Sequence, residues 1–98
     1  MALTITNNQG IFEINGSLIN KNALSLEHHF HQLMNHKEKI VISLSKVSHV
    51  DTYGVRVLTN LYKNAMKSNK IFYIIGKENK KVQKAFGKVN YILRNDFV

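Results

Sequence analysis

The sequence has 98 residues and 44% of them are hydrophobic, so it has the size of one domain and too many apolar residues for a disordered chain. It has no cysteine, which excludes disulfides, thiol catalysis and thiolate metal sites. Fourteen basic residues, twelve of them lysines, against six acidic ones give a net charge of +8. This surplus suggests an acidic partner: a protein face, an anionic membrane or a nucleic acid.

The first five residues lack the basic start and the apolar run of a signal peptide. No apolar run approaches the ~20 residues of a membrane-spanning helix. We therefore expect one cytoplasmic domain over residues 1–98.

The first third of the chain predicts a hairpin and a helix. Two β-rich runs, 3–6 and 11–14, flank Asn7-Asn8-Gln9-Gly10, which has the composition of a turn. A helix with one apolar face follows from Ala23 to about residue 35, and Asn22 could cap it. The residues of this face are Ala23, Leu26, Phe30, Leu33 and Met34.

The middle of the chain predicts a βαβ unit. Residues 39–44 have the pattern of a buried strand, and a short connector leads to a helix that Asp51 can cap and that runs to about Ser68. Residues 71–75 form a second buried strand, ended by Gly76. Two strands joined in this way should be parallel. The apolar face of the helix comprises Val55, Leu58, Leu61, Tyr62, Ala65 and Met66.

The last part predicts a third helix over residues 79–87, with Val82, Ala85 and Phe86 inward, and a final strand over residues 89–93. The order of elements is then β-β-α-β-α-β-α-β. This order indicates an α/β fold in which helices pack against a mixed β-sheet.

The segment from Ile42 to Val55 carries the most functional information. A buried strand leads into Asp-Thr-x-Gly at the start of a helix. The backbone N–H groups of a helix start are unpaired and carry a positive partial charge, so a phosphate on an exposed hydroxyl there would lie near donors. Gly54 could let another chain approach the first turn. The segment is therefore a good place for a phosphorylation switch.

Residues 44–54 (LSKVSHVDTYG) and the order of elements resemble the STAS domain family. The family pattern is a strand, Asp-Leu-Ser-x-Val-x-x, a hydrophobic residue and Asp-Ser/Thr-x-Gly. Gly16-x-Leu18 before the first helix and Asn69-Lys70 before the strand 71–75 also fit. The resemblance covers nearly the whole chain and implies a single STAS domain.

One group in this family, the anti-sigma factor antagonists, is phosphorylated on the hydroxyl residue directly after the aspartate. The kinase is the partner, and it is also the anti-sigma factor. The resemblance thus implies a protein-binding module in transcription regulation, with Thr52 as the phosphoacceptor. The next residue is usually small, but here it is Tyr53, whose ring could alter or block docking of the kinase. The implied partner contact comprises Asp51, Thr52, Tyr53, Gly54, Val55 and Arg56.

A second group is the small STAS subunit of bacterial lipid ABC transporters, which binds the cytosolic ATPase. The compact chain and the choice of threonine at position 52 are closer to this group. The 51–54 region would then be a permanent contact, and the lysines of the third helix could lie near anionic lipid heads. Otherwise those lysines form a solvated face. They are Lys77, Lys80, Lys81, Lys84 and Lys88.

Other classes of function find less support. Two arginines and no known motif argue against specific nucleic-acid binding, although a basic nucleic-acid accessory protein is a third hypothesis. His49, Asp51 and Thr52 have the residue types of a catalytic triad, but a triad enzyme also needs an oxyanion-binding site. No other acids form a catalytic pair and there is no phosphate-binding loop, so we expect no enzyme. His28, His29 and His31 lack further ligands beyond Glu27, so we expect neither a metal nor another cofactor.

Overall fold

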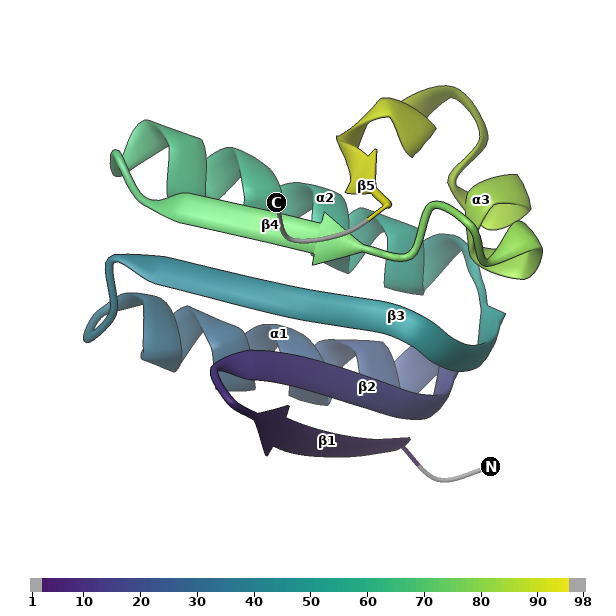
Figure 1. Ribbon diagram of the computed structural model, residues 1–98, viewed down its shortest axis with the longest axis horizontal. Helices are drawn as coiled ribbons and strands as arrows, with labels where there is room; N and C mark the ends of the chain where they lie inside the picture. The colour runs from purple at the N-terminus through teal and green to yellow at the C-terminus, as the bar shows by residue number, and fades with distance from the viewer. Residues whose placement is uncertain (1–2, 96–98) are drawn as a thin grey trace.

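Five strands form one sheet in the order β1-β2-β3-β4-β5 in the computed structural model, which describes residues 3–95. The strands are β1 (Leu3–Asn8), β2 (Ile11–Leu18), β3 (Lys39–Val50), β4 (Ile71–Ile75) and β5 (Leu93–Arg94). β1 is antiparallel to β2, and the other neighbouring strands are parallel (Figure 1). The predicted α/β fold with a mixed sheet is confirmed.

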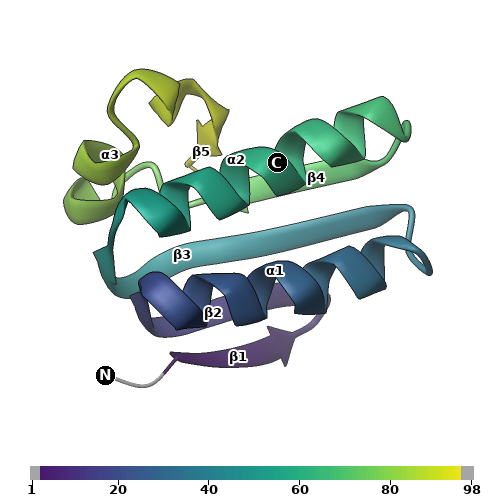
Figure 2. The same ribbon diagram turned by 180° about the vertical axis from the view of Figure 1, so that it is seen from behind.

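Two long helices, α1 (Asn20–Met34) and α2 (Thr52–Lys67), lie side by side on one face of the sheet (Figure 2). The shorter α3 (Lys80–Phe86) and the 3₁₀ segment η1 (Gly87–Ile92) lie beyond the C-terminal end of β4. Because α2 joins the parallel neighbours β3 and β4, the predicted βαβ unit is confirmed.

A two-residue turn closes the hairpin of β1 and β2. Gln9 and Gly10 have φ angles of 54° and 89°, the left-handed conformation that matches the twist of hairpin strands. The side-chain oxygen of Asn7 accepts a hydrogen bond from the Gly10 N–H at 3.0 Å. The predicted hairpin is confirmed, and its strands extend to the turn.

The core lies between the sheet and the inner faces of α1 and α2. Phe12 of β2 and Phe30 of α1 meet edge to face in this core, with ring centroids 5.3 Å apart. The predicted apolar faces of α1 and α2 pack against this core, apart from Met66, for which the prediction was wrong. Its side chain is 62% exposed, because each residue turns a helix by about 100° and Met66 follows the buried Ala65. In α3, Val82 and Phe86 are buried as predicted, whereas Ala85 is only partly buried.

The first helix begins earlier than predicted. α1 starts at Asn20, so Asn22 lies inside the helix and is not its cap. The Asn22 side chain instead donates to the carbonyl of Ser17 at 3.2 Å. The Asn20 N–H donates to the Asp51 carboxylate at 3.1 Å. A contact between residues so far apart in the chain satisfies this helix start, and no local capping pattern announces it.

β3 is longer than the predicted strand over residues 39–44. It continues to Val50, so the expected connector is itself a strand that pairs with β2. Two shifts of register between β2 and β3, after Glu13 and after Gly16, each accommodate an extra residue of β3, and the strands stay paired to the pair Leu18–Val50. These irregularities bring the end of β2 next to the start of α2.

The C-terminal segment also differs from the prediction. α3 matches the predicted third helix, with Asn79 as its N-cap. The predicted final strand is present as β5, but its bounds differ: most of residues 89–93 form the 3₁₀ segment η1, and β5 holds two residues only. Ile92 and Leu93 are both buried, so the apolar run is explained by burial around the turn.

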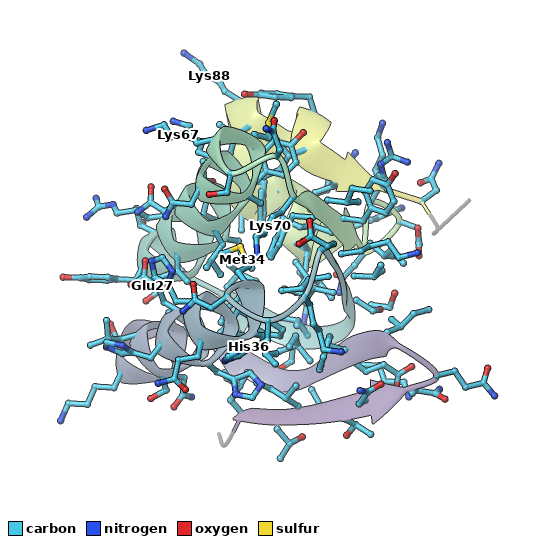
Figure 3. All side chains as sticks on the ribbon, turned by 90° about the vertical axis from the view of Figure 1, so that its left-hand side faces the viewer. Glu27, Met34, His36, Lys67, Lys70 and Lys88 are labelled. Atoms are coloured by element: carbon cyan, nitrogen blue, oxygen red, sulfur yellow. The ribbon has the colours of Figure 1, made fainter. Side chains whose placement is uncertain are left out.

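Lys70 binds the C-terminal end of α1. It lies between α2 and β4, and its ammonium donates to the carbonyl oxygens of Met34 and, at 3.3 Å, Lys37 (Figure 3). A cation is favourable at this end of α1, because the last carbonyls of a helix are unpaired and carry a negative partial charge. The contact holds the end of α1 against the loop before β4.

Candidate functional site

Asp51 organises the start of α2. One carboxylate oxygen accepts from the Gly54 N–H at 2.9 Å, and the other accepts from the Asn20 N–H at 3.1 Å. The Asp51 N–H donates to the carbonyl of Leu18 at 3.4 Å. The predicted N-cap is confirmed, and the same side chain also joins the starts of α1 and α2. Both helices are thereby fixed to the end of β2.

Thr52 is the first residue of α2 and is exposed. Its hydroxyl makes no hydrogen bond with any residue from 3 to 95, so neither the cap nor the core uses it. The Asp51 carboxylate already takes the Gly54 N–H, but the helix start remains a region of positive partial charge. A modification of this hydroxyl would therefore break no hydrogen bond between described residues.

Tyr53 and Arg56 extend the exposed surface along α2. The Tyr53 side chain is 58% exposed, and the Arg56 guanidinium carbon lies 5.8 Å from the centre of its ring. A cation at this distance attracts the ring weakly in water and more strongly when a partner covers the pair. These residues thus offer an aromatic and a charged group side by side.

Gly54 faces inward, so the expectation that it admits another chain is corrected. It is buried, and a Cβ atom built on it would lie 2.4 Å from the carbonyl oxygen of Leu18 and 3.1 Å from a methyl carbon of Val50. The glycine is needed because β2 and α2 of this chain approach each other closely. Val55 is also partly buried against the core. Of the six residues predicted to contact a partner, Thr52, Tyr53 and Arg56 are exposed.

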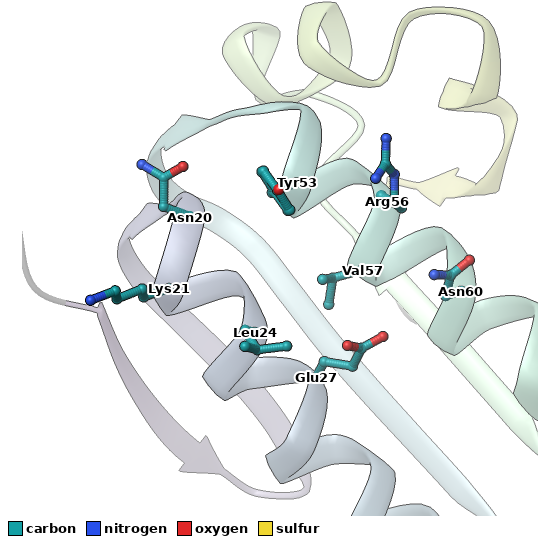
Figure 4. Close-up of a pocket in the computed structure, with 8 residues that line it drawn as sticks. All are labelled: Asn20, Lys21, Leu24, Glu27, Tyr53, Arg56, Val57 and Asn60. Carbon is teal, nitrogen blue, oxygen red and sulfur yellow. The ribbon is translucent and has the colours of Figure 1, made fainter.

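A groove between α1 and α2 adjoins these exposed residues (Figure 4). It has a volume of about 380 Å³. Leu24 on α1 is 53% exposed and lies across the groove from Tyr53 and Val57 of α2. Its lining residues are Asn20, Lys21, Leu24, Glu27, Tyr53, Arg56, Val57 and Asn60.

The groove was not predicted from the sequence, although one signal was present. Leu24 stands outside the apolar face of α1 that Ala23 and Leu26 share, and large apolar residues away from a buried face often contact a partner. Val57, which lines the groove from α2, is buried, but it was not among the residues of the predicted apolar face. Which helix lies across from Leu24 depends on the packing of α1 on α2, and no local pattern specifies that.

The side chains that could suggest catalysis are engaged elsewhere. His49 Nδ1 lies 3.2 Å from Ser48 Oγ, while both Asp51 oxygens accept from backbone N–H groups, so the triad-like arrangement does not form. Within residues 3–95 there is no group of three histidine, cysteine or acidic side chains that could hold a metal ion. Nor does that part of the chain contain a helix long and apolar enough to cross a membrane.

Comparison with known proteins agrees with this fold. The family model of the STAS domain matches residues 1–90. The chain belongs to the STAS domain family. STAS domains are typically non-catalytic regulatory modules.

Two solved structures share this STAS fold. An anti-sigma factor antagonist from Mycobacterium paratuberculosis is 18% identical, with a TM-score of 0.64 over 98% of this chain and 86% of that chain. The anti-sigma factor antagonist SpoIIAA in its unphosphorylated form is 13% identical, with a TM-score of 0.65 over 98% of this chain and 90% of that chain. Among curated proteins, none matches the sequence significantly.

Proposed function

We propose that this STAS domain is a protein-binding regulatory module of the anti-sigma factor antagonist type, and that phosphorylation of Thr52 controls the release of its partner. The observation that carries the proposal is the position of Thr52: an exposed, unbonded hydroxyl on the first residue of α2, beside Tyr53 and the α1–α2 groove. Two structurally similar proteins are anti-sigma factor antagonists, which supports the same reading.

The switch would work because a negative charge at Thr52 costs little free energy in the free protein and much more in the complex. A phosphate adds roughly 1.5–2 negative charges at pH 7. In the free protein those charges stay in water at the positive end of α2, which tolerates them. In a complex they would lose water without gaining a partner, which costs several kcal/mol. Unmodified Thr52 would bind, and phosphorylated Thr52 would release.

The apolar character of the same surface supports a second candidate function. Leu24 and Tyr53 are both more than half exposed, and they face each other across the groove. Such a pair is suited to a permanent contact that needs no modification. This arrangement favours the STAS subunit of a lipid transporter, bound to its ATPase through the groove and the start of α2.

The two functions predict different behaviour for two variants of Thr52. Thr52→Ala removes only an unbonded hydroxyl, and Thr52→Glu adds one charge at the helix start, so both should melt within a few degrees of the wild type. Under the switch hypothesis, Thr52→Ala keeps the partner in a pull-down from the native host and Thr52→Glu loses it. Under the permanent-contact hypothesis, both variants lose affinity. Mass spectrometry of the captured partner then distinguishes a kinase from an ATPase.

The matched control is Thr4→Glu, which places the same charge on an exposed residue of β1. It should keep all partners. If Thr52→Glu retains the same partners at the same yield as Thr4→Glu, Thr52 is not the switch and the contact surface lies elsewhere.

A further inference from the structure

A second hollow lies on the other side of the start of α2, between the end of β3 and α3. It has a volume of about 320 Å³ and is lined by three residues from each element. β3 contributes Ser48, His49 and Val50, and α3 contributes Lys81, Lys84 and Ala85. Figure 1 shows α3 near the C-terminal end of β3. Among the described residues, the hollow is thus lined by two lysines and a histidine and by no acidic side chain.

The two walls are held in place by Asn79. Its side-chain oxygen accepts from the N–H groups of Lys81 and Val82 and so caps α3. Its amide nitrogen donates to backbone carbonyls of β3, with distances of 3.0 Å to Leu44 and Val47 and 3.3 Å to Ser45. One side chain therefore fixes the first turn of α3 against β3, and the lysines are presented from a preformed wall.

No carboxylate of residues 3–95 forms an ion pair with the lysines of this wall. Lys81 and Lys84 stand three residues apart, so they share a face of α3, where like charges repel each other. Neither forms an ion pair with a carboxylate in the described part of the chain. By contrast, Lys46 of β3 lies 3.7 Å from Glu13. An anion in the hollow would relieve the repulsion between the two lysines.

The orientation of His49 follows from its neighbours. Ser48 Oγ donates its single proton to the carbonyl of Gly16 at 3.1 Å, so it can only accept from His49 Nδ1, 3.2 Å away. Nδ1 therefore carries a proton, and Nε2 is the nitrogen left for a ligand. In this tautomer Nε2 is an acceptor, so it can pair with the hydroxyl of a singly protonated phosphate.

We propose that the hollow between the end of β3 and α3 binds a phosphate monoester, held by Lys81, Lys84 and the imidazole of His49. Ammonium groups bind phosphate as point charges, and the negative charge of a monoester matches a wall with two lysines and, among residues 3–95, no acidic side chain. The surroundings point the same way, because residues 77–94 contain six of the fourteen basic residues and one of the six acidic ones. The site is separate from the α1–α2 groove, so it does not depend on the function proposed above.

The test is an NMR titration of the ¹⁵N-labelled full chain with inorganic phosphate and with glycerol 3-phosphate, at constant ionic strength set with chloride. Saturable shifts should concentrate at residues 48–50 and 81–85. The double variant Lys81→Gln/Lys84→Gln should bind at least about tenfold more weakly, because it removes two charge-assisted contacts. The control Lys63→Gln/Lys67→Gln changes the same charge on exposed lysines of α2 and should bind as the wild type does.

A vesicle assay separates the two sources of such a phosphate. Phosphatidic acid carries a phosphate monoester, whereas phosphatidylserine at equal surface charge does not. Tighter binding to phosphatidic acid, lost in Lys81→Gln/Lys84→Gln, assigns the site to a lipid headgroup. Localised binding of the soluble phosphates without that preference assigns it to a free monoester. Shifts spread over all lysines, or equal losses in both double variants, would overturn the proposal.

Discussion

At the scale of a residue, Gly54 is needed for the fold, although it belongs to the Asp-Thr-x-Gly motif that predicts a partner contact. It lies between Thr52 and Arg56, both exposed, yet a Cβ atom here would be 2.4 Å from the Leu18 carbonyl oxygen. That oxygen belongs to the backbone of β2 and cannot rotate away. Gly54→Ala must therefore displace α2 from β2, and we expect a loss of roughly 2–3 kcal/mol in the free energy of unfolding.

Urea denaturation checks this value, with Asn60→Ala as the control because Asn60 is exposed on the same helix. The control should change stability by about 0.5 kcal/mol or less. If Gly54→Ala is as stable as the control, the close approach of α2 to β2 does not exist in solution. Partner binding that fails while stability holds would restore Gly54 to the contact surface.

At the scale of an element, Asn79 holds α3 in place, because it caps α3 and also donates hydrogen bonds to β3. Asn79→Ala should cost about 2 kcal/mol, from a lost cap and from carbonyls left without a donor. Asn79→Asp distinguishes the two roles. Aspartate is as good an N-cap as asparagine, but its carboxylate cannot donate and would face three carbonyl oxygens.

We therefore expect Asn79→Asp to be at least as destabilising as Asn79→Ala. Amide exchange at Lys81 and Val82 should be fastest in Asn79→Ala, because aspartate still accepts from both N–H groups. Thermal or urea unfolding and hydrogen exchange measure the two effects. Wild-type stability in Asn79→Asp would mean that Asn79 acts as a cap alone and that α3 is free of β3.

The helices and strands also show which features of the fold could be predicted from the sequence. Local patterns predicted the hairpin, the helix faces and the parallel pair β3–β4, since periodicity and a βαβ connection specify them. They also predicted the Asp51 cap. The start of α1 was missed because its first N–H is bound by Asp51, 31 residues away. The extent of β3 was missed because it depends on register shifts between β2 and β3. The groove beside Leu24 was missed because it depends on how α1 packs on α2.

At the scale of the whole molecule the dominant property is charge, and its distribution is uneven. Lys67 and Lys88 lie toward one end of the molecule in Figure 3, and α3 carries three lysines and no acid. A net charge of +8 attracts any polyanion, including DNA, without implying recognition of a sequence. Nucleic-acid binding is therefore the property most easily mistaken for function.

We predict that duplex DNA binds this protein weakly and without sequence preference, with a Kd in the micromolar range or above at physiological salt, as expected for non-specific binding. Titration by fluorescence anisotropy between 50 and 200 mM salt should give a linear plot of log K against log salt. The slope of this plot is negative. Its magnitude should decrease by about 1.8 in Lys81→Gln/Lys84→Gln if both lysines neutralise DNA phosphates. Binding should be equal for unrelated sequences, because shared backbone phosphates would supply all the contacts. A nanomolar complex that prefers one sequence at physiological salt would contradict this prediction and would rank the nucleic-acid hypothesis above the protein-binding one.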